Sequence, residues 1–275
     1  MFRFIRGWFV LFMACFALAG QAQDFEALKQ AAITGDAKAL GVIQRVAEQG
    51  NAEGQYHLGD YYVGKGNYDE AKKWFRKAAE QGYAPASRRL AGRYSVDSRA
   101  AGNKAEAVKW YRKAAEQGDA ISQNELGNLY ANKFFDSGVA RNDAEAVKWY
   151  RKAAEQGYVD AQNSLGFMYA SGRGVTRDFA EAVKWYRKAA EQGDDIAAYR
   201  LAEHYAHGLG VTKNEAEAVK WYGEVAGYSC VTDNLSEAWS NSRASIKMLA
   251  KKGNPDARKM VKKLRLDADD DVECM

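Results

Sequence analysis

One glutamate and two histidines around position 204 are the residues of this chain most able to bind a metal ion. Glu203, His204 and His207 would lie within one turn of each other if this segment is helical, and two histidines at such a spacing can supply two metal ligands. The H-E-x-x-H pattern is absent, however, and the sequence offers no obvious third ligand. We therefore interpret both histidines as surface residues and expect no metal site.

The sequence also lacks the motif set of serine enzymes that act on β-lactams. Neither S-x-x-K nor K-T-G occurs in the 275 residues, and Thr232-Asp233-Asn234 matches S-D-N only in part. The acidic run Asp267–Asp271 lacks the spacing and the glycine of a calcium loop, which favours a solvated tail. Three G-x-G pairs follow no predicted strand and are interpreted as turns between helices: Gly64/Gly66, Gly172/Gly174 and Gly208/Gly210. We expect neither catalytic residues nor a cofactor.

A fourteen-residue string defines the organisation of the chain, because it recurs without change. AEAVKWYRKAAEQG occupies Ala105–Gly118, Ala144–Gly157 and Ala180–Gly193, with looser copies at Asp69–Gly82 and Ala216–Gly227. The tryptophans of the five copies are 36, 39, 36 and 36 residues apart. Self-similarity at a fixed period indicates a repeat architecture, which presents extended surfaces rather than one active-site cleft.

The repeated string predicts an amphipathic helix with defined ends. In one copy the apolar stripe of period 3.6 consists of Ala146, Val147, Trp149, Tyr150, Ala153 and Ala154. Asn or Asp precedes a glutamate by three residues, as in a capping box whose glutamate reaches back to the N-cap. These N-cap residues are Asn67, Asn103, Asn142, Asp178 and Asn214. A glycine in the left-handed conformation is expected to end the helix at Gly82, Gly118, Gly157 and Gly193.

Another helix is predicted before each copy of the string. Its landmark is a leucine followed by Gly or Ala, with a tyrosine four residues after the leucine. The leucines are Leu58, Leu90, Leu126, Leu165 and Leu201. One helical hairpin cannot bury both of its faces, whereas a stack of hairpins can, so the sequence predicts an all-α solenoid.

The combined pattern A-x-x-x-L-G-x-x-Y-x-x-G-x-G-V, followed by A-V-K-W-Y-R-K-A-A-E-Q-G, resembles the Sel1-like repeats, the longer relatives of tetratricopeptide repeats. The resemblance implies a right-handed α/α superhelical solenoid that mediates protein–protein interaction and is not an enzyme. The repeats are expected at 52–83, 84–119, 120–158, 159–194 and 195–230. Residues 23–51 should form a helical cap or a degenerate repeat. Residues 231–275 should form a second cap, with helices at about 235–251 and 255–266, and an acidic tail.

Residues 1–22 predict export from the cytoplasm. Arg3 and Arg6 precede the apolar run Gly7–Leu18, and small residues favour cleavage after Ala19 or Ala22. This run is shorter than the roughly 18 residues that a membrane-spanning helix needs, so a signal peptide is favoured over a membrane anchor. We expect a periplasmic or secreted protein of the bacterial envelope, without a membrane span after cleavage.

Charge and cysteine content restrict the partners further. Loss of Arg3 and Arg6 would lower the net charge from +4 to +2, which is too little to indicate a nucleic-acid partner. The two remaining cysteines, Cys230 and Cys274, could form a disulfide in an oxidising compartment. They could equally stay unpaired, since residues next to a chain end are often mobile.

Partner-binding residues are expected on the first helix of each repeat, because it varies whereas the second helix is nearly constant. By resemblance to tetratricopeptide geometry, offsets −5, −2, +2, +5 and +6 from the leucine face a concave groove. The candidates are Tyr56, Asp60, Arg88, Asn124, Asn128, Asn163, Phe167, Tyr199, Glu203 and His207. Aromatic rings and amides are typical of recognition surfaces. The alternative is that these are solvent positions that drift on a repetitive scaffold.

The predicted function is a non-catalytic scaffold that binds a protein or peptide in this groove as a regulatory adaptor. An immunity protein that neutralises a delivered toxin is the alternative. A hydrolase of cell-wall or β-lactam substrates, claimed for some cysteine-rich Sel1-like proteins, is disfavoured by the missing motifs.

Overall fold

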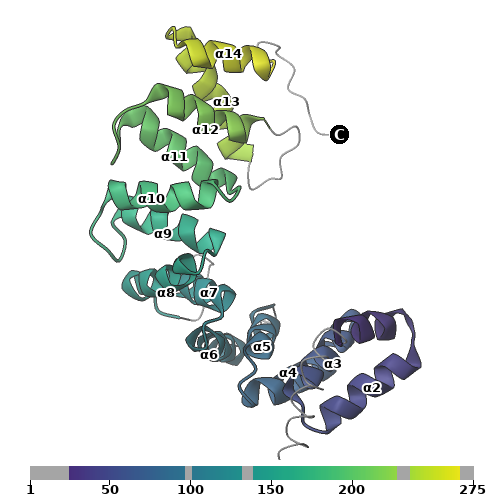
Figure 1. Ribbon diagram of the computed structural model, residues 1–275. Helices are drawn as coiled ribbons and strands as arrows, with labels where there is room; N and C mark the ends of the chain where they lie inside the picture. Colours follow the sequence, from purple (N-terminus) through teal and green to yellow (C-terminus); the bar gives the residue numbers. More distant parts are fainter. Residues whose placement is uncertain (1–24, 97–100, 132–138, 228–235, 267–275) are drawn as a thin grey trace, which may run out of the picture. The chain divides into compact units, whose positions relative to one another are not determined.

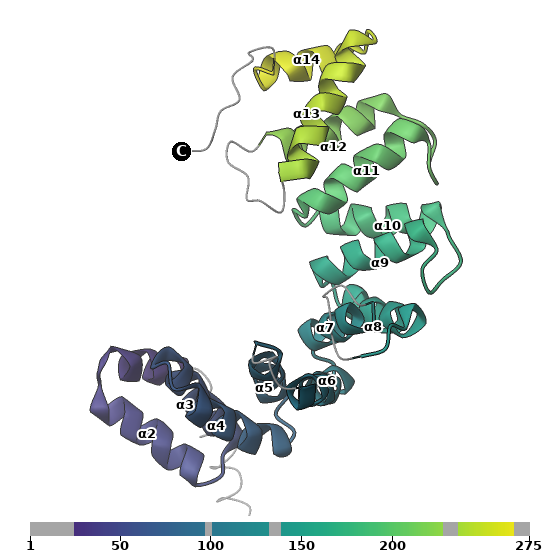
Figure 2. The same ribbon diagram turned by 180° about the vertical axis from the view of Figure 1, so that it is seen from behind.

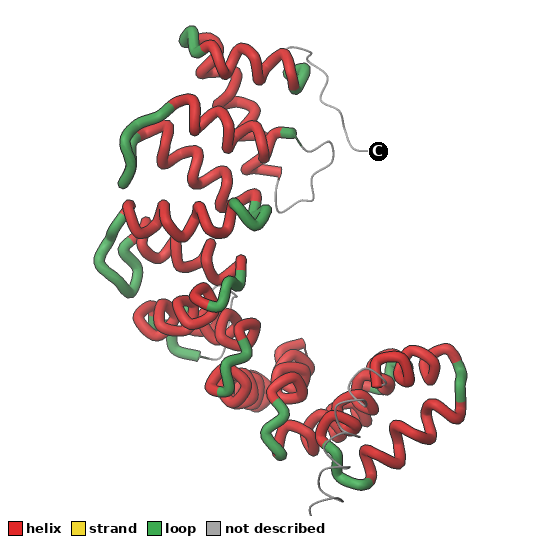
Figure 3. Tube along the Cα trace, in the orientation of Figure 1, coloured by secondary structure: helices red, strands yellow, loops and turns green. Residues whose placement is uncertain are grey.

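The protein is described by a computed structural model that covers residues 25–96, 101–131, 139–227 and 236–266. All regular secondary structure in these residues is helical, and short loops join the helices (Figure 3). The chain divides into two compact units, residues 1–122 and 123–275. The predicted all-α fold is confirmed.

Successive helices pair into hairpins that stack on one another within each unit, as Figure 1 and Figure 2 show from opposite sides. In the first unit residues 25–34 are helical and precede α2 (Ala37–Glu48), α3 (Ala52–Gly64), α4 (Tyr68–Glu80), α5 (Ala84–Val96) and α6 (Ala101–Glu116). Then follow α7 (Ala120–Tyr130), α8 (Asp143–Glu155), α9 (Val159–Ser171), α10 (Phe179–Ala190), α11 (Asp195–His207), α12 (Glu215–Ala226), α13 (Ser236–Lys251) and α14 (Pro255–Lys263). The first helices of the repeats are therefore α3, α5, α7, α9 and α11.

The predicted N-caps of the second helices are confirmed at α4, α8, α10 and α12. The side chains of their N-cap residues accept a hydrogen bond from the N–H of the glutamate three residues on, at 3.0–3.2 Å. In α4, α8 and α10 the side chain of that glutamate pairs with a lysine instead of reaching back, as in Glu70–Lys73 and Glu145–Lys148 at 2.6 Å. The closing glycines Gly82, Gly118, Gly157 and Gly193 have φ of 89–94°. They thus adopt the left-handed conformation that was expected.

One predicted N-cap is wrong. The helix α6 begins at Ala101, so Asn103 lies inside its first turn and does not cap it. The residue directly before Asn103 is Gly102, which has a low helix propensity, so local propensity does not explain why the helix extends beyond the cap position that the repeat pattern suggests.

The glycine after the constant leucine explains how closely the two helices of a hairpin pack. A Cβ atom on Gly59, Gly127 or Gly166 would lie 2.5–2.7 Å from the ring of Phe75, Tyr150 or Tyr186, respectively. Carbon atoms in contact are normally about 3.5–4.0 Å apart. In these three repeats the aromatic residue after the tryptophan therefore packs directly on the backbone of the first helix. The tryptophan itself is less deeply buried there. In α4 and α10 a lysine three residues on lies 3.9 and 4.2 Å from its ring centroid.

Two kinds of polar contact join neighbouring repeats within each unit. An arginine of the string donates to the tyrosine of the next first helix, as Arg151 does to Tyr169 at 2.6 Å. The glutamine of the string donates to a glutamine of its own first helix, as Gln192 does to Gln162 at 2.7 Å. Gln162 donates in turn to the carbonyl of Ala154 in the preceding repeat at 3.2 Å. These contacts explain why the string is nearly constant, since its polar residues hold the stack together.

Candidate functional site

The predicted partner-binding residues of the first unit are engaged within the protein. Tyr56 packs against the rings of His57, Phe75 and Tyr83, with centroids 5.2–5.9 Å apart. The Asp60 carboxylate lies 3.4 Å from Arg89 and 3.8 Å from Lys29, and its side chain is 9% exposed. Arg88 donates to Asp119 at 3.3 Å, and the Asp119 side chain also accepts from the Ser122 N–H. These contacts stabilise the stack and leave little surface for a partner.

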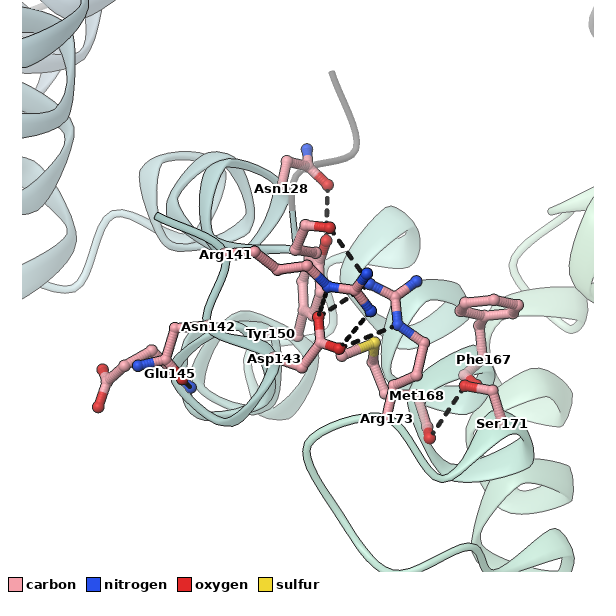
Figure 4. Close-up of polar contacts among 11 residues, drawn as sticks. Asn128, Arg141, Asn142, Asp143, Glu145, Tyr150, Phe167, Met168, Ser171 and Arg173 are labelled. Atoms are coloured by element: carbon pink, nitrogen blue, oxygen red, sulfur yellow. Dashed lines mark hydrogen bonds and ion pairs between the residues drawn. The ribbon is translucent and has the colours of Figure 1, made fainter. Parts of the chain in front are cut away.

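Asn124 and Asn128 are buried, so the prediction that they face a partner is wrong. Their exposed fractions are 3% and 6%. The Asn128 side-chain oxygen accepts a hydrogen bond from the Tyr150 hydroxyl at 2.9 Å (Figure 4), and burial raises the pKa of Tyr150. A buried tyrosine hydroxyl needs a polar partner. Here Asn128, the residue at offset +2 on the facing helix of the hairpin, supplies it.

The same arrangement recurs in the last repeat. Glu203, also at offset +2, accepts a hydrogen bond from the hydroxyl of Tyr222. The ring of Tyr199 lies 6.0 Å from that of Tyr222, and the exposed His207 has its Nε2 3.6 Å from the Glu203 carboxylate. Glu203 therefore satisfies a partly buried hydroxyl, and among these residues His207 alone is largely exposed.

The interpretation of His204 as a surface residue is wrong, because its side chain is only 6% exposed. Its Nδ1 lies 2.8 Å from the carbonyl oxygen of Leu209, and its ring contacts those of Phe179 and Tyr186. Burial lowers the pKa of His204. The described residues contain no group of three His, Cys, Asp or Glu side chains placed to hold a metal ion.

The helix α9 differs from its neighbours at offset +2, where it carries Phe167. This ring is 36% exposed. The hairpin tyrosine, Tyr186, still packs on Gly166, but Phe167 offers its hydroxyl no acceptor. Arg200 lies near it instead, with its guanidinium carbon 5.6 Å from the ring centroid. Burial raises the pKa of Tyr186 to about 12, and Arg200 opposes this shift.

Phe167 borders a pocket of about 420 Å³ within the second unit, which we call the Phe167 pocket. It is lined by Ala131, Tyr150, Asn163, Ser164, Phe167, Met168, Arg173, Ile196 and Arg200. Apolar side chains from α9 and α11 face polar groups from α8, α9 and the loop after α9. Such a combination of apolar wall and few polar groups is typical of binding pockets.

A pair of arginines fixes one side of this pocket. Arg173, from the loop between α9 and α10, donates to both Asp143 oxygens at 3.1 and 2.8 Å and to the Ala131 carbonyl at 3.2 Å. Arg141 binds the same carboxylate at 3.1 and 2.6 Å. These bonds from Arg141 and Arg173 hold the pKa of Asp143 at about 2. Figure 4 shows both arginines converging on Asp143, with Phe167 on the other side of Arg173.

Arg200 is held in place on the other side. One of its guanidinium nitrogens donates to the Asn163 side-chain oxygen at 2.7 Å. The Asn163 amide donates in turn to Asp194, the N-cap of α11, at 3.1 Å. The Arg200 guanidinium carbon lies 5.2 Å from the Phe167 ring centroid, within reach of a cation–π interaction. The arginines around the pocket outnumber its carboxylates, so the pocket favours an anionic or hydrogen-bond-accepting group.

Of the ten predicted residues, Asn163 and Phe167 are thus brought together in one pocket, and the others are not. Arg173 and Arg200 also line this pocket and were not among the predicted residues. A signal was present in the comparison of repeats, because the loop GRGV carries Arg173 where the loop GLGV carries Leu209.

Several predictions concern segments outside the described residues. The signal peptide at residues 1–22, Cys230 and Cys274 all lie there. In the part of the chain that the structure describes, no helix has the length and apolar character needed to cross a bilayer.

Comparison with known proteins identifies the family. The Sel1 repeat profile matches residues 52–83, 85–119, 120–158, 159–194 and 195–224. The structure of a Sel1 repeat protein from Oxalobacter formigenes is 32% identical, with a TM-score of 0.70, and the match covers 87% of this chain and 97% of that one. A protective antigen present in uropathogenic Escherichia coli strains, which displays an SLR fold, is also 32% identical, with a TM-score of 0.64 over 87% of this chain. The match covers 59% of that longer antigen. A search of curated proteins gave no significant match. With five matched segments and two such structural relatives, this chain belongs to the Sel1 repeat family.

Proposed function

We propose that the protein is a non-catalytic scaffold that binds a segment of a partner protein in the Phe167 pocket and acts as a regulatory adaptor. Sel1 repeats generally mediate protein interactions. The observation that carries the proposal is the ring of Phe167, 36% exposed, at a position where α7 and α11 place a polar acceptor.

The presence of phenylalanine instead of a polar residue at offset +2 of α9 lowers the stability of the hairpin. An intramolecular hydrogen bond contributes about 0.5–1.5 kcal/mol, and with Phe167 the hairpin of α9 and α10 forgoes the one that Asn128 gives Tyr150. The Phe167 side chain does not provide this bond and leaves a third of its surface in water. It therefore needs another role. Aromatic residues and arginines dominate the energetics of protein interfaces, and the guanidinium carbons of two arginines lie within 6 Å of the Phe167 ring centroid.

The pocket defines the chemistry of the partner segment. An apolar side chain would contact Phe167, Met168 and Ile196, while a carboxylate or carbonyl oxygen next to it would accept from Arg200. Hydrogen bonds from a charged donor are about twice as strong as neutral ones. Asn163 already orients the guanidinium, so little side-chain entropy is lost when the partner binds.

The proposal includes a location in the bacterial envelope. It is supported by the charged start, apolar run and small residues of positions 1–22. Protease added to spheroplasts should degrade the protein while a cytoplasmic marker survives. Protection of the protein together with the marker would contradict export.

Site-specific cross-linking tests the interaction. A photoreactive amino acid in place of Ile196, in the full chain and in its native cells, should cross-link a partner that mass spectrometry identifies. Calorimetry with the purified partner then compares wild type with Phe167→Ala, which should bind at least about tenfold more weakly because it removes an aromatic anchor. Tyr68→Ala is the matched control, since Tyr68 is an exposed aromatic residue of the first unit. Equal affinity of wild type and Phe167→Ala would refute the site.

A further inference from the structure

The last two helices, α13 and α14, form a groove that is separate from the Phe167 pocket. We propose that this groove is a second interaction surface, which binds an acidic segment of a partner protein. The groove has a volume of about 480 Å³ and is called the basic groove below. It is lined by Lys247, Ala250, Lys251, Arg258, Val261, Lys262 and Leu266.

The two helices contribute to the groove in the same pattern. Lys247, Ala250 and Lys251 have the spacing i, i+3 and i+4, as do Arg258, Val261 and Lys262, and residues at this spacing share one face of a helix. The helices pack against each other at the end of the second unit, as Figure 1 and Figure 2 show. Four cationic side chains therefore flank a floor of small and apolar ones.

Part of this arrangement is rigid. The Arg258 Nε donates to the Ala250 carbonyl of the facing helix at 3.2 Å, which links the two walls of the groove. On the floor, Val261 is 6% exposed and Leu266 is fully buried. The groove is therefore built into the packing of α13 against α14.

Within the part of the chain that the structure describes, the four groove cations have no carboxylate partner, whereas several cations of the repeats do. In the repeats, lysines of the constant string pair with a glutamate three residues before them, as in Lys73–Glu70, Lys148–Glu145 and Lys184–Glu181. Among the described residues, no carboxylate lies within 4.0 Å of the four groove cations. Residues 237–266 contain nine Lys and Arg but two Asp and Glu, a net charge of +7, whereas the whole chain has +4. Such a concentration of like charge favours an anionic partner.

The shape of the groove favours a polypeptide over a membrane or a nucleic acid. Peripheral helices bind membranes by inserting protruding apolar side chains, but Val261 and Leu266 lie buried below the cations. On each helix the two groove cations are one helical turn apart, about 6 Å. This length matches two residues of an extended chain at about 3.3 Å each, and it is too short for a continuous basic track along a nucleic acid. The expected ligand is an extended segment with carboxylates on both sides of an apolar residue.

Fluorescence anisotropy with a labelled peptide tests this proposal on the full chain. The peptide Glu-Leu-Glu-Glu-Leu-Glu should bind, and the same peptide with glutamine for glutamate should bind at least about tenfold more weakly. The double variant Lys251→Glu/Arg258→Glu should weaken binding of the acidic peptide at least about tenfold. The control Lys252→Glu/Lys263→Glu changes the net charge equally outside the groove and should weaken it less than about threefold. If the first variant loses helical content, Lys251→Gln/Lys262→Gln replaces it. This variant should bind the acidic peptide at least about threefold more weakly than wild type.

Four results would overturn the proposal. An equal loss in the groove variant and in the control variant would indicate general electrostatic attraction. Equal affinity for the glutamine peptide would show that charge is not recognised. Binding to phosphatidylglycerol vesicles through Lys251 and Arg258 without binding to the peptide would assign the surface to a membrane. Tighter peptide binding, by about tenfold or more, in Asp269→Asn/Asp270→Asn/Asp271→Asn would assign the groove to the acidic run of this chain.

Discussion

Replacement of Gly166 by alanine should destabilise the second unit, whereas the same replacement at Gly41 should stabilise the first. Both glycines lie inside helices, α9 and α2. A Cβ atom on Gly41 would meet no heavy atom within 4 Å, but on Gly166 it would lie 2.7 Å from two ring carbons of Tyr186. That ring is 2% exposed and lies 5.6 Å from the ring of His204. It therefore has little room to move away from a new methyl group.

The expected change in stability is the sum of two opposing contributions. Alanine in place of glycine inside a helix stabilises it by about 0.5–1 kcal/mol. At Gly166 the new methyl group would overlap the ring by about 1 Å, given a normal carbon–carbon contact of about 3.5–4.0 Å. Overpacking a dense core costs about 1–3 kcal/mol, and the confined ring places the cost in the upper half of this range. The net effect is a loss of about 1–2.5 kcal/mol at Gly166 and a gain of about 0.5–1 kcal/mol at Gly41.

Urea unfolding followed by circular dichroism measures these changes, and hydrogen exchange assigns them to each unit, since repeat arrays can open locally. In a Tyr186→Leu background the cost of Gly166→Ala should fall below about 0.5 kcal/mol, because the clashing ring is gone. A Gly166→Ala variant as stable as wild type, or more stable, would refute the argument that the approach of Tyr186 requires glycine.

Three further substitutions test the polar contacts of the second unit. Asn128→Ala removes the acceptor of the Tyr150 hydroxyl and should lower the free energy of unfolding by about 0.5–1.5 kcal/mol, but by much less in a Tyr150→Phe background. Asp143→Asn should destabilise the unit at neutral pH. The folded pKa of Asp143 is depressed from 3.8 to about 2, so its contribution is present above the unfolded pKa and is lost as the pH falls toward 2. The urea midpoints of Asp143→Asn and wild type should therefore converge in acid. Burial lowers the folded pKa of His204 below 6.5, so the unfolded chain binds a proton first as the pH falls. Stability should decline as the pH falls through 6.5, the ordinary pKa of histidine, and less steeply in His204→Gln.

Each of these expectations has a result that contradicts it. Equal losses for Asn128→Ala in both backgrounds would show that Tyr150 is not the partner that matters. A constant difference between Asp143→Asn and wild type at all pH values would exclude the carboxylate charge as the cause. An unchanged pH dependence in His204→Gln would assign the acid sensitivity to other groups.

The second helix of each repeat could be predicted closely because short-range rules determine it. All six residues of the expected stripe in α8 are buried, and the caps at Asn142 and Gly157 lie where the pattern puts them. The wrong N-cap prediction at Asn103 shows the limit of these rules, because the start of a helix also depends on the residues before the cap. The burial of His204 could have been predicted by comparing the repeats. The equivalent position in α9 is Met168, an apolar residue that is 2% exposed, and this indicates a face directed toward the core.

The candidate site was less predictable, because it is built from segments that are distant in the sequence. Asn128 appeared available to a partner because one helix alone does not reveal the Tyr150 hydroxyl across the hairpin. The Phe167 pocket needs Arg173 from a loop and Arg200 from the next repeat. Offsets from a leucine describe one helix at a time and therefore cannot combine these three contributions.

The contacts between repeats explain why so few positions are left for recognition. Arginine and glutamine of the constant string bind the neighbouring helices, so substitution there would weaken the stack. On the first helices, Asn163 and Glu203 are also bonded within the protein. Phe167 departs from this rule, and the basic groove lies outside the five matched repeats. The two surfaces share no lining residue, since the Phe167 pocket includes residues of α11 but none of α13 or α14. Each surface can then change its partner without disturbing the other, which is the property that an adaptor requires.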